Sequence, residues 1–128
     1  MDKSPKKKIL IVDDERGFRD FYVYILEPLG AEVTCVTNGL EAVQKIEESP
    51  YDLVFMDVHM PVMDGLEAFR RIRKIRPQQQ VVFFSSSSDA NLSKENEAVR
   101  QGALFCLYKP VDLEDIRKVL VKAVGLNL

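Results

Sequence analysis

Short apolar segments alternate along the chain with longer segments in which apolar residues recur every three or four positions. Four short segments are almost continuously apolar and one alternates with polar residues, which predicts strands at 8–12, 32–37, 53–56, 81–84 and 103–108. The longer segments have the spacing of amphipathic helices. Continuous apolar strands are typical of parallel sheets buried on both faces. The pattern therefore predicts an α/β fold of five βα units, with one parallel sheet between two layers of helices.

Capping residues mark the ends of the predicted helices. Asn38, Asp64 and Asp112 each precede a helical segment, and their side-chain oxygens can accept a hydrogen bond from its first turn. Gly30 is expected to end the first helix. The residues expected to face the core are, helix by helix, Phe18, Phe21, Tyr22, Ile25 and Leu29; Leu40, Val43 and Ile46; Leu66, Phe69 and Ile72; and Leu113, Ile116, Leu120, Ala123 and Val124.

Three further features are interpreted as structural. Segment 89–101 has few apolar residues at helical spacing, so we expect its helix to be the least firmly held. Cys35 and Cys106 lie in β-patterned segments without metal-site spacing and are predicted to be buried free thiols. The third helix carries a group of basic residues that we interpret as a solvated face: Arg70, Arg71, Arg73, Lys74 and Arg76.

Composition restricts the possible classes of function. The chain of 128 residues has the length of one domain, and 46% hydrophobic with 30% charged residues is typical of a globular protein. A net charge of −2 gives no electrostatic reason to bind nucleic acid. Without a membrane-spanning stretch or a signal peptide, the sequence predicts a cytoplasmic protein with no membrane contact. We expect a flexible N-terminus at 1–7, one domain over 8–125 and no output domain.

Carboxylates follow two of the apolar strands. Asp13 and Asp14 come directly after 8–12, and Asp57 comes directly after 53–56. Ligands of open α/β sheets bind at the carboxyl ends of the strands, where these side chains would meet. Like charges at such range raise one another's pKa unless a cation neutralises them, and Mg²⁺ prefers oxygen ligands. The sequence therefore predicts a Mg²⁺ site at this edge.

The last two strands add a hydroxyl and an ammonium group to the same edge. Ser85 follows 81–84, and Lys109 follows 103–108. A hydrogen-bond donor and a cation beside metal ligands suit a phosphoryl group, whose transfer depends on positioning and on charge neutralisation. An aspartate can serve as the nucleophile of such a transfer.

Several motifs occur in a fixed order, and they are Ile11-Val12-Asp13-Asp14-Glu15, Phe55-Met56-Asp57-Val58-His59-Met60-Pro61, Met63-Asp64-Gly65, Gly102-Ala103 and Lys109-Pro110. Through them the chain closely resembles the receiver domain of bacterial response regulators over essentially its whole length. The resemblance implies a flavodoxin-like (βα)5 three-layer sandwich with the strand order 2-1-3-4-5. It also implies a response regulatory domain over 8–125 and a cis bond before Pro110.

The resemblance implies a role for each site residue. Asp57 would accept a phosphoryl group from the phosphohistidine of a histidine kinase or histidine phosphotransfer protein. Asp14, Asp57 and the backbone carbonyl of His59 would bind Mg²⁺, and Asp13 would act through bound water. Lys109 would pair with the phosphoryl oxygens. Phosphorylation would repack the surface of the fourth helix, fifth strand and fifth helix, and the signal would pass to an unidentified partner protein. Such a protein is no enzyme beyond its own phosphorylation and dephosphorylation.

The identity of the switch hydroxyl depends on the direction of counting. Counting from Asp57 through the apolar run gives Ser85, whereas counting back from Gly102 gives Ser87. A lengthening of the loop after the fourth strand explains the difference and favours Ser85.

The roles of two further positions have more than one interpretation. Cys106 stands where the family commonly has a tyrosine or phenylalanine that changes rotamer on activation, and Phe105 and Tyr108 are possible substitutes. The side chain of His59 either tunes dephosphorylation or is a solvent-exposed loop group.

Three other functions remain as alternatives. The chain could be the receiver part of a longer response regulator or hybrid kinase. A phosphatase-like enzyme could use the same nucleophile and metal, although the chain is short for a domain that covers a substrate. A phosphorylation-independent interaction module could keep the fold without the switch.

Overall fold

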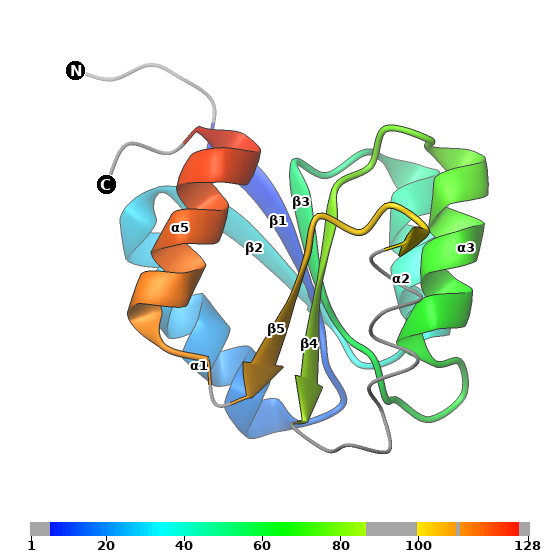
Figure 1. Ribbon diagram of the computed structural model, residues 1–128, viewed down its shortest axis with the longest axis horizontal. Helices are drawn as coiled ribbons and strands as arrows, with labels where there is room; N and C mark the ends of the chain where they lie inside the picture. The colour runs from blue at the N-terminus through cyan, green and yellow to red at the C-terminus, as the bar shows by residue number, and fades with distance from the viewer. Residues whose placement is uncertain (1–5, 87–99, 110, 126–128) are drawn as a thin grey trace.

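The computed structural model describes residues 6–86, 100–109 and 111–125 (Figure 1). Every strand begins and ends within two residues of its predicted bounds. Ser87, Pro110 and most of the predicted helix at 89–101 lie outside the described residues. In chain order the elements are β1 (Lys7–Val12), α1 (Arg16–Leu26), the 3-10 helix η1 (Glu27–Leu29), β2 (Ala31–Val36), α2 (Gly39–Glu48), β3 (Leu53–Asp57), α3 (Gly65–Ile75), β4 (Val81–Ser86), β5 (Phe105–Lys109) and α5 (Leu113–Val124).

The five strands form one parallel sheet in the order β2-β1-β3-β4-β5, which confirms the predicted topology. Helices α1 and α5 cover one face, and α2 and α3 cover the other (Figure 1). The register pairs Val12 with Met56, Asp57 with Phe84 and Ser86 with Lys109. The carboxyl ends of β1, β3, β4 and β5 therefore share one edge, as expected of the flavodoxin-like sandwich.

The sheet separates two apolar cores. Strand β3 is buried along its whole length, which explains its continuous apolar sequence. Alternate residues of each strand point to opposite faces and enter different cores. The core under α2 and α3 includes Leu10, Val12, Val54, Met56, Phe69, Ile72 and Phe83. The core under α1 and α5 includes Ile9, Ile11, Tyr22, Phe55, Phe84, Ile116 and Leu120.

The predicted N-caps are confirmed. The side chain of Asn38 accepts a hydrogen bond from the backbone N–H of Glu41, at 2.9 Å. The Asp64 and Asp112 side chains make the same contact with the third residue of their helices, at 2.9 and 2.8 Å. Such caps satisfy backbone donors that a helix leaves unpaired in its first turn. Gly30, in the left-handed conformation with φ 91°, follows η1 and ends the first helical segment.

Three predicted core residues are wrong, and the first is Phe21 of α1, which is 41% exposed. Leu40 is 40% exposed and follows Gly39, where α2 lies so close to the β3–α3 loop that an added Cβ would be only 2.6 Å from the carbonyl oxygen of Met63. The side chains of α2 that are buried are the predicted Val43 and Ile46 together with Ala42. Leu113 is 45% exposed and is the first residue of α5, at the carboxyl edge of the sheet.

The prediction of two buried thiols also needs correction. Cys35 is exposed, and Cys106 is partly buried. Cys35 lies on β2, which is an edge strand of the sheet and is less covered than β3. Neither cysteine is part of a disulfide bond, as predicted.

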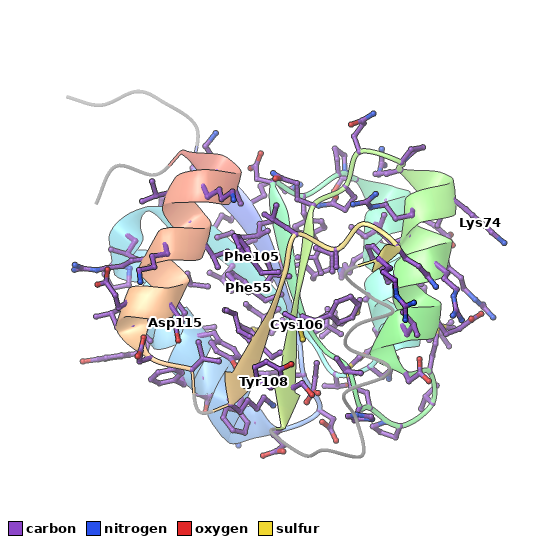
Figure 2. The ribbon with its side chains drawn as sticks, viewed as in Figure 1. Phe55, Lys74, Phe105, Cys106, Tyr108 and Asp115 are labelled. Carbon is purple, nitrogen blue, oxygen red and sulfur yellow. The ribbon has the colours of Figure 1, made fainter. Side chains whose placement is uncertain are left out.

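The basic face of α3 is only partly a solvated face. Arg70, Arg71 and Lys74 are exposed, and Lys74 extends away from the helix (Figure 2). Arg73 instead donates from Nε to the carbonyl oxygen of Gln79 at 2.9 Å and from Nη2 to that of Gly102 at 2.7 Å. Arg76 donates from Nε to the carbonyl oxygen of Ile46 at 2.7 Å. Two of the five cations therefore bind backbone carbonyls of other segments.

Candidate functional site

Three charged side chains from the ends of different strands meet at the carboxyl edge of the sheet. Asp13 follows β1, Asp57 ends β3 and Lys109 ends β5. The Nζ atom of Lys109 lies 3.0 Å from Oδ2 of Asp13 and 3.0 Å from Oδ2 of Asp57. The parallel register produces this meeting, since it aligns the ends of strands that are far apart in the sequence.

Both carboxylates are removed from solvent and held by the backbone. Asp13 is fully buried and Asp57 is 6% exposed. The backbone N–H of Glu15 donates to Oδ1 of Asp13, and that of His59 donates to Oδ1 of Asp57, both at 3.0 Å. Each carboxylate thus accepts from a backbone group two residues ahead with one oxygen and from Lys109 with the other. These contacts fix both carboxylate orientations.

Burial dominates the electrostatics of Asp57. It raises the pKa of this carboxyl above the ordinary value, and the charge of Asp13 adds to the effect. The hydrogen bond from His59 and the ammonium of Lys109 oppose the rise without cancelling it. Burial also lowers the pKa of Lys109, but its hydrogen bonds to Asp13 and Asp57 outweigh this and leave the pKa above the ordinary value. Lys109 therefore stays charged beside a carboxylate whose charge is costly.

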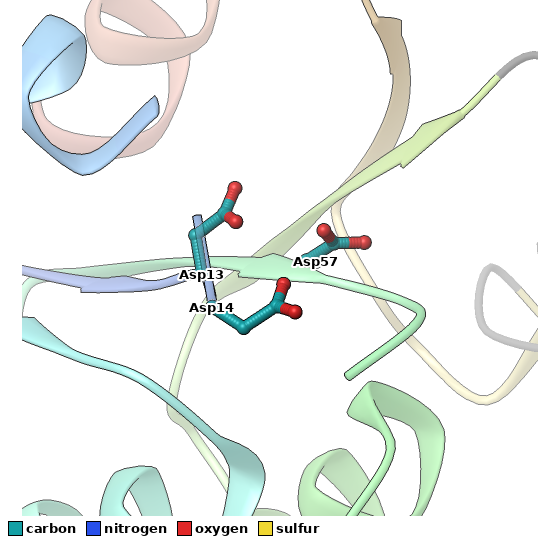
Figure 3. Close-up of side chains that lie close together, drawn as sticks. All are labelled: Asp13, Asp14 and Asp57. Carbon is teal, nitrogen blue, oxygen red and sulfur yellow. The ribbon is translucent and has the colours of Figure 1, made fainter. Parts of the chain in front are cut away.

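A third carboxylate completes a cluster that could hold a cation. Oxygens of Asp13, Asp14 and Asp57 all lie within 4.8 Å of one another, and Asp14 is exposed while the other two are buried (Figure 3). Carboxylate oxygens are the ligands that hard divalent cations such as Mg²⁺ prefer, and Mg²⁺ usually keeps several waters. The exposed side of Asp14 leaves access for such waters. The donor chemistry of this cluster therefore fits Mg²⁺.

Backbone hydrogen bonds close the loop between β3 and α3 and join it to α2. The backbone N–H of Gly65 donates to the carbonyl oxygen of Val58 at 2.9 Å, and that of Gly39 donates to Met63 at 3.3 Å. At Gly65 an added Cβ would lie 2.3 Å from the carbonyl oxygen of Asp57, so only glycine fits. Within the loop, Val62 has a positive φ of 71°, which is uncommon for a β-branched residue.

Of the two candidates for the switch hydroxyl, the structure describes Ser85 but not Ser87. Ser85 is fully buried in the last part of β4, where it pairs with Tyr108, next to the Asp57–Phe84 pair. This position agrees with the count from Asp57. Ser87 lies outside the described residues.

Phe105 and Tyr108, the two possible substitutes for the aromatic residue that Cys106 replaces, lie on different faces of the sheet. Cys106 packs against the core under α2 and α3, whereas Phe105 packs against the core under α1 and α5 (Figure 2). Tyr108 shares the face of Cys106, because alternate residues of a strand point the same way. It is 44% exposed and closer to the carboxyl edge. Of these two residues, Tyr108 is therefore the one on the same face of the sheet as Cys106.

The side chain of His59 is partly buried. Its Nε2 atom is buried and has no hydrogen-bond partner among the described residues. The backbone of His59 contacts Asp57 directly, as described above. Its side chain therefore lies in a partly enclosed position near the acidic cluster, which does not match a freely solvated loop group.

An aromatic neighbour of Lys109 was not predicted as part of the site. The Nζ atom of Lys109 lies 3.9 Å from the ring centroid of Phe18 in α1. Sequence reasoning assigned Phe18 only to the core, and no local signal joins it to a residue so distant in the chain. A groove of about 370 Å³ opens beside this ring and is lined by Glu15, Gly17, Phe18, Phe21, Tyr22 and Val111.

None of the described helices is long and apolar enough to span a membrane.

Comparison with known proteins agrees with the fold and with the acidic cluster. The sequence matches the response regulator receiver domain family over residues 9–121. Response regulator receiver protein CpdR of Brucella abortus (strain 2308) is 35% identical, over 91% of this chain and 99% of that protein. Sporulation initiation phosphotransferase F of Bacillus subtilis (strain 168) is 31% identical, over 94% and 96%. The receiver domain of sensor histidine kinase PA1611 from Pseudomonas aeruginosa PAO1, solved with a magnesium ion coordinated in its active site cleft, has a TM-score of 0.84 and 28% identity, over 94% and 98%. The chain belongs to the response regulator receiver domain family.

Proposed function

We propose that this receiver domain is a phosphorylation-dependent signalling switch whose phosphoryl acceptor is Asp57. The observation that carries the proposal is the position of Lys109, whose ammonium lies 3.0 Å from both Asp13 and Asp57. A fixed cation beside a buried carboxylate suits a reaction in which negative charge accumulates at that carboxylate. The family supports phosphoryl acceptance in general terms.

The proposed reaction uses Asp57 as a nucleophile. One carboxylate oxygen attacks the phosphorus of a phosphohistidine on a histidine kinase or histidine phosphotransfer protein. An O–P bond forms as the P–N bond breaks, and the donor imidazole leaves with the electron pair of that bond and takes a proton from water. Lys109 pairs with the transferred phosphoryl oxygens, and the hydroxyl of Ser85 donates a hydrogen bond to one of them.

The same cluster would hold the metal. Asp14, Asp57 and the backbone carbonyl of His59 would bind Mg²⁺ directly, and Asp13 would act through bound water. When bound, Mg²⁺ neutralises negative charge on the carboxylates and on the transferred group. The donor chemistry of the three aspartates supports this assignment.

Switching follows from differential contacts. The phosphoryl group is a new anion, and it favours the arrangement in which Lys109 and Ser85 both contact it. In this proposal the change reaches the surface of β5 and α5, where Tyr108 and Val121 are exposed, and a partner protein reads it there. The partner is identified only as a protein that distinguishes the two states.

Intact-protein mass spectrometry tests the proposal. The protein is incubated with acetyl phosphate, with Mg²⁺ or with EDTA, and compared with Asp57→Asn. We expect a gain of one phosphoryl group that requires Mg²⁺ and is absent in Asp57→Asn. Asp112→Asn is the matched control, because asparagine also serves as an N-cap and Asp112 lies outside the acidic cluster.

Other outcomes favour the alternatives. No adduct on wild-type protein, with a control regulator phosphorylated alongside, contradicts the proposal for small donors and favours a phosphorylation-independent module. If a purified histidine kinase also transfers nothing, the proposal fails. Many turnovers of a phosphomonoester would instead indicate a phosphatase-like enzyme. The reading frame in the genome decides whether the receiver belongs to a longer protein, as the PA1611 receiver belongs to a sensor kinase.

A further inference from the structure

Among the described residues, Lys109 contacts two carboxylates and one aromatic ring in the site. An ammonium group has three N–H donors, and the Asp13 and Asp57 contacts use two of them. The third side faces the ring of Phe18, whose centroid is 3.9 Å from Nζ. The Lys109 side chain is only 9% exposed, so little water reaches it. A cation over an aromatic face at this distance is attracted to the ring, and more strongly where water is excluded.

The orientation of the Phe18 ring is set by the core. It stacks on Tyr22 with a centroid distance of 6.4 Å, and Tyr22 stacks on Phe84 at 4.7 Å. Phe84 is the strand partner of Asp57 in the sheet. The ring that faces the ammonium is thus the last of a stack that begins beside the acceptor carboxylate. Phe18 itself is only partly buried and borders the groove described above.

The ring of Phe18 keeps the Lys109 ammonium from being hydrated in the groove. Without the ring, the space beside the ammonium would join a groove of about 370 Å³, and water could hydrate the charge there. A hydrated lysine side chain with four rotatable bonds loses its fixed position. Leucine in place of Phe18 would keep an apolar side chain but would offer no negatively polarised face.

We propose that Phe18 is a positioning residue that holds the Lys109 ammonium between Asp13 and Asp57 through the face of its ring. This role rests on the proposed function, in which Lys109 contacts the phosphoryl group that Asp57 accepts. Phe18 does not touch the reacting atoms. It limits the positions available to the Lys109 ammonium, which does touch them, so the loss of the Phe18 ring is expected to slow phosphoryl acceptance.

The test compares Phe18→Leu, Phe18→Tyr and Phe21→Leu with the wild type. Phe21 is the matched control, because it lines the same groove on the same helix and is 41% exposed, while the ring that faces the Lys109 ammonium is that of Phe18. The first measurement is the rate of phosphoryl incorporation from acetyl phosphate at saturating Mg²⁺. We expect Phe18→Leu to be slower by about tenfold, in line with the loss of a desolvated cation–π contact, and Phe18→Tyr and Phe21→Leu to stay close to wild type.

The second measurement needs no phosphorylation. A ring facing Nζ shifts the NMR signals of the Lys109 ε-methylene protons upfield, and we expect Phe18→Leu to remove that shift while Phe18→Tyr and Phe21→Leu keep it. The amide spectrum of each variant shows whether it is folded. An unchanged Lys109 signal or rate in folded Phe18→Leu overturns the proposal, as does an equal loss in Phe21→Leu. Wild-type protein that accepts no phosphoryl group overturns the proposed function and the positioning role, while the NMR shift still reports whether the contact exists.

Discussion

Asp57 is a carboxylate placed where burial opposes its charge. The backbone N–H of His59 and the ammonium of Lys109 stabilise the charged form, but burial and the neighbouring charge of Asp13 outweigh them. A protein that needed only stability would place a neutral or apolar residue here. The cost is consistent with a site that is completed when a further cation binds.

This imbalance predicts that Asp57→Asn is more stable than the wild type at neutral pH without metal. Because the pKa of Asp57 is raised in the folded protein, that state binds more protons than the unfolded one between the ordinary pKa of 3.8 and the raised pKa. Stability therefore falls as the pH rises through this window. Asparagine has nearly the same shape without the charge, so its advantage is largest at pH 7 and shrinks toward the ordinary carboxyl range.

Urea unfolding in EDTA at several pH values measures this difference. Asp112→Asn serves as the control for an aspartate whose cap survives the change. An advantage of Asp57→Asn that is the same at pH 7 and at acid pH would show that the charge is not its source.

The sequence predicted the charged residues of the site but not their surroundings. Asp13, Asp57 and Lys109 were predictable because each follows an apolar strand, and parallel strands bring such positions to one edge. The contact between Phe18 and Lys109 was not predictable, because helical spacing assigns Phe18 to the core without saying which atom lies above its ring. The exposure of Cys35 depends on the position of its strand in the sheet, which its local pattern does not give.

Helix α3 connects segments that are distant in the sequence. Its apolar residues Leu66, Phe69 and Ile72 pack on the sheet, while Arg73 and Arg76 bind carbonyls of three other segments. The Arg73 guanidinium also lies over the ring of Phe69, with a distance of 5.1 Å to the centroid. These contacts fix the approach to β4 and the connection before β5. The positions of β4 and β5, and hence of Lys109, depend in part on this helix.

We therefore expect Arg73→Ala to destabilise the protein by about 1–2 kcal/mol, since two hydrogen bonds from a charged group to carbonyls are lost. Lys74→Ala, at the next position on the exposed side, should change stability by no more than about 0.5 kcal/mol. Chemical denaturation of the two variants side by side measures both effects. Equal destabilisation would mean that the helix propensity or charge of α3, and not the carbonyl contacts, is responsible.

The amphipathic spacing of α3 could not show that Arg73 binds backbone carbonyls while Lys74 is exposed. It located the apolar face of α3 correctly, because the periodicity of apolar residues depends only on the helix itself. One of the two carbonyl partners of Arg73 is that of Gly102, 29 residues away, which leaves no mark on the local pattern. Phe21, Leu40 and Leu113 were misassigned for a similar reason, since helical spacing does not show which apolar positions the neighbouring segments cover.

At the scale of the whole molecule, the acidic cluster joins the ends of β1 and β3, which occupy the centre of the sheet together with β4. The two apolar cores lie on opposite faces of these same strands. A ligand that binds the cluster thus binds only the folded arrangement of the central strands. Its binding free energy adds to the stability of the entire domain.

Mg²⁺ is therefore expected to raise the melting temperature of the wild type, and EDTA should reverse the effect. At a concentration of 100 times its Kd, a ligand of this kind stabilises by about 2.7 kcal/mol. Asp14→Asn should reduce the shift, because it removes one carboxylate of the cluster. Asp52→Asn is the control, since Asp52 precedes β3 at the opposite edge of the sheet. Calorimetry at matched ionic strength separates binding from screening, and equal shifts in all three proteins would contradict a specific site.

The hydrogen-bonded loop after β3 has a consequence for how the proposed metal site could be lost by mutation. The ligand that we assign to His59 is a main-chain oxygen, so any residue type at position 59 still supplies it. The loop that carries this oxygen packs closely against two glycines, Gly39 and Gly65, where even one extra methyl group would collide with the backbone of the loop or strand. Single-base changes at these glycines could therefore disable a ligand that no change at position 59 can delete. In the proposed site, mutations that displace this ligand are therefore expected at glycines that are not themselves metal ligands.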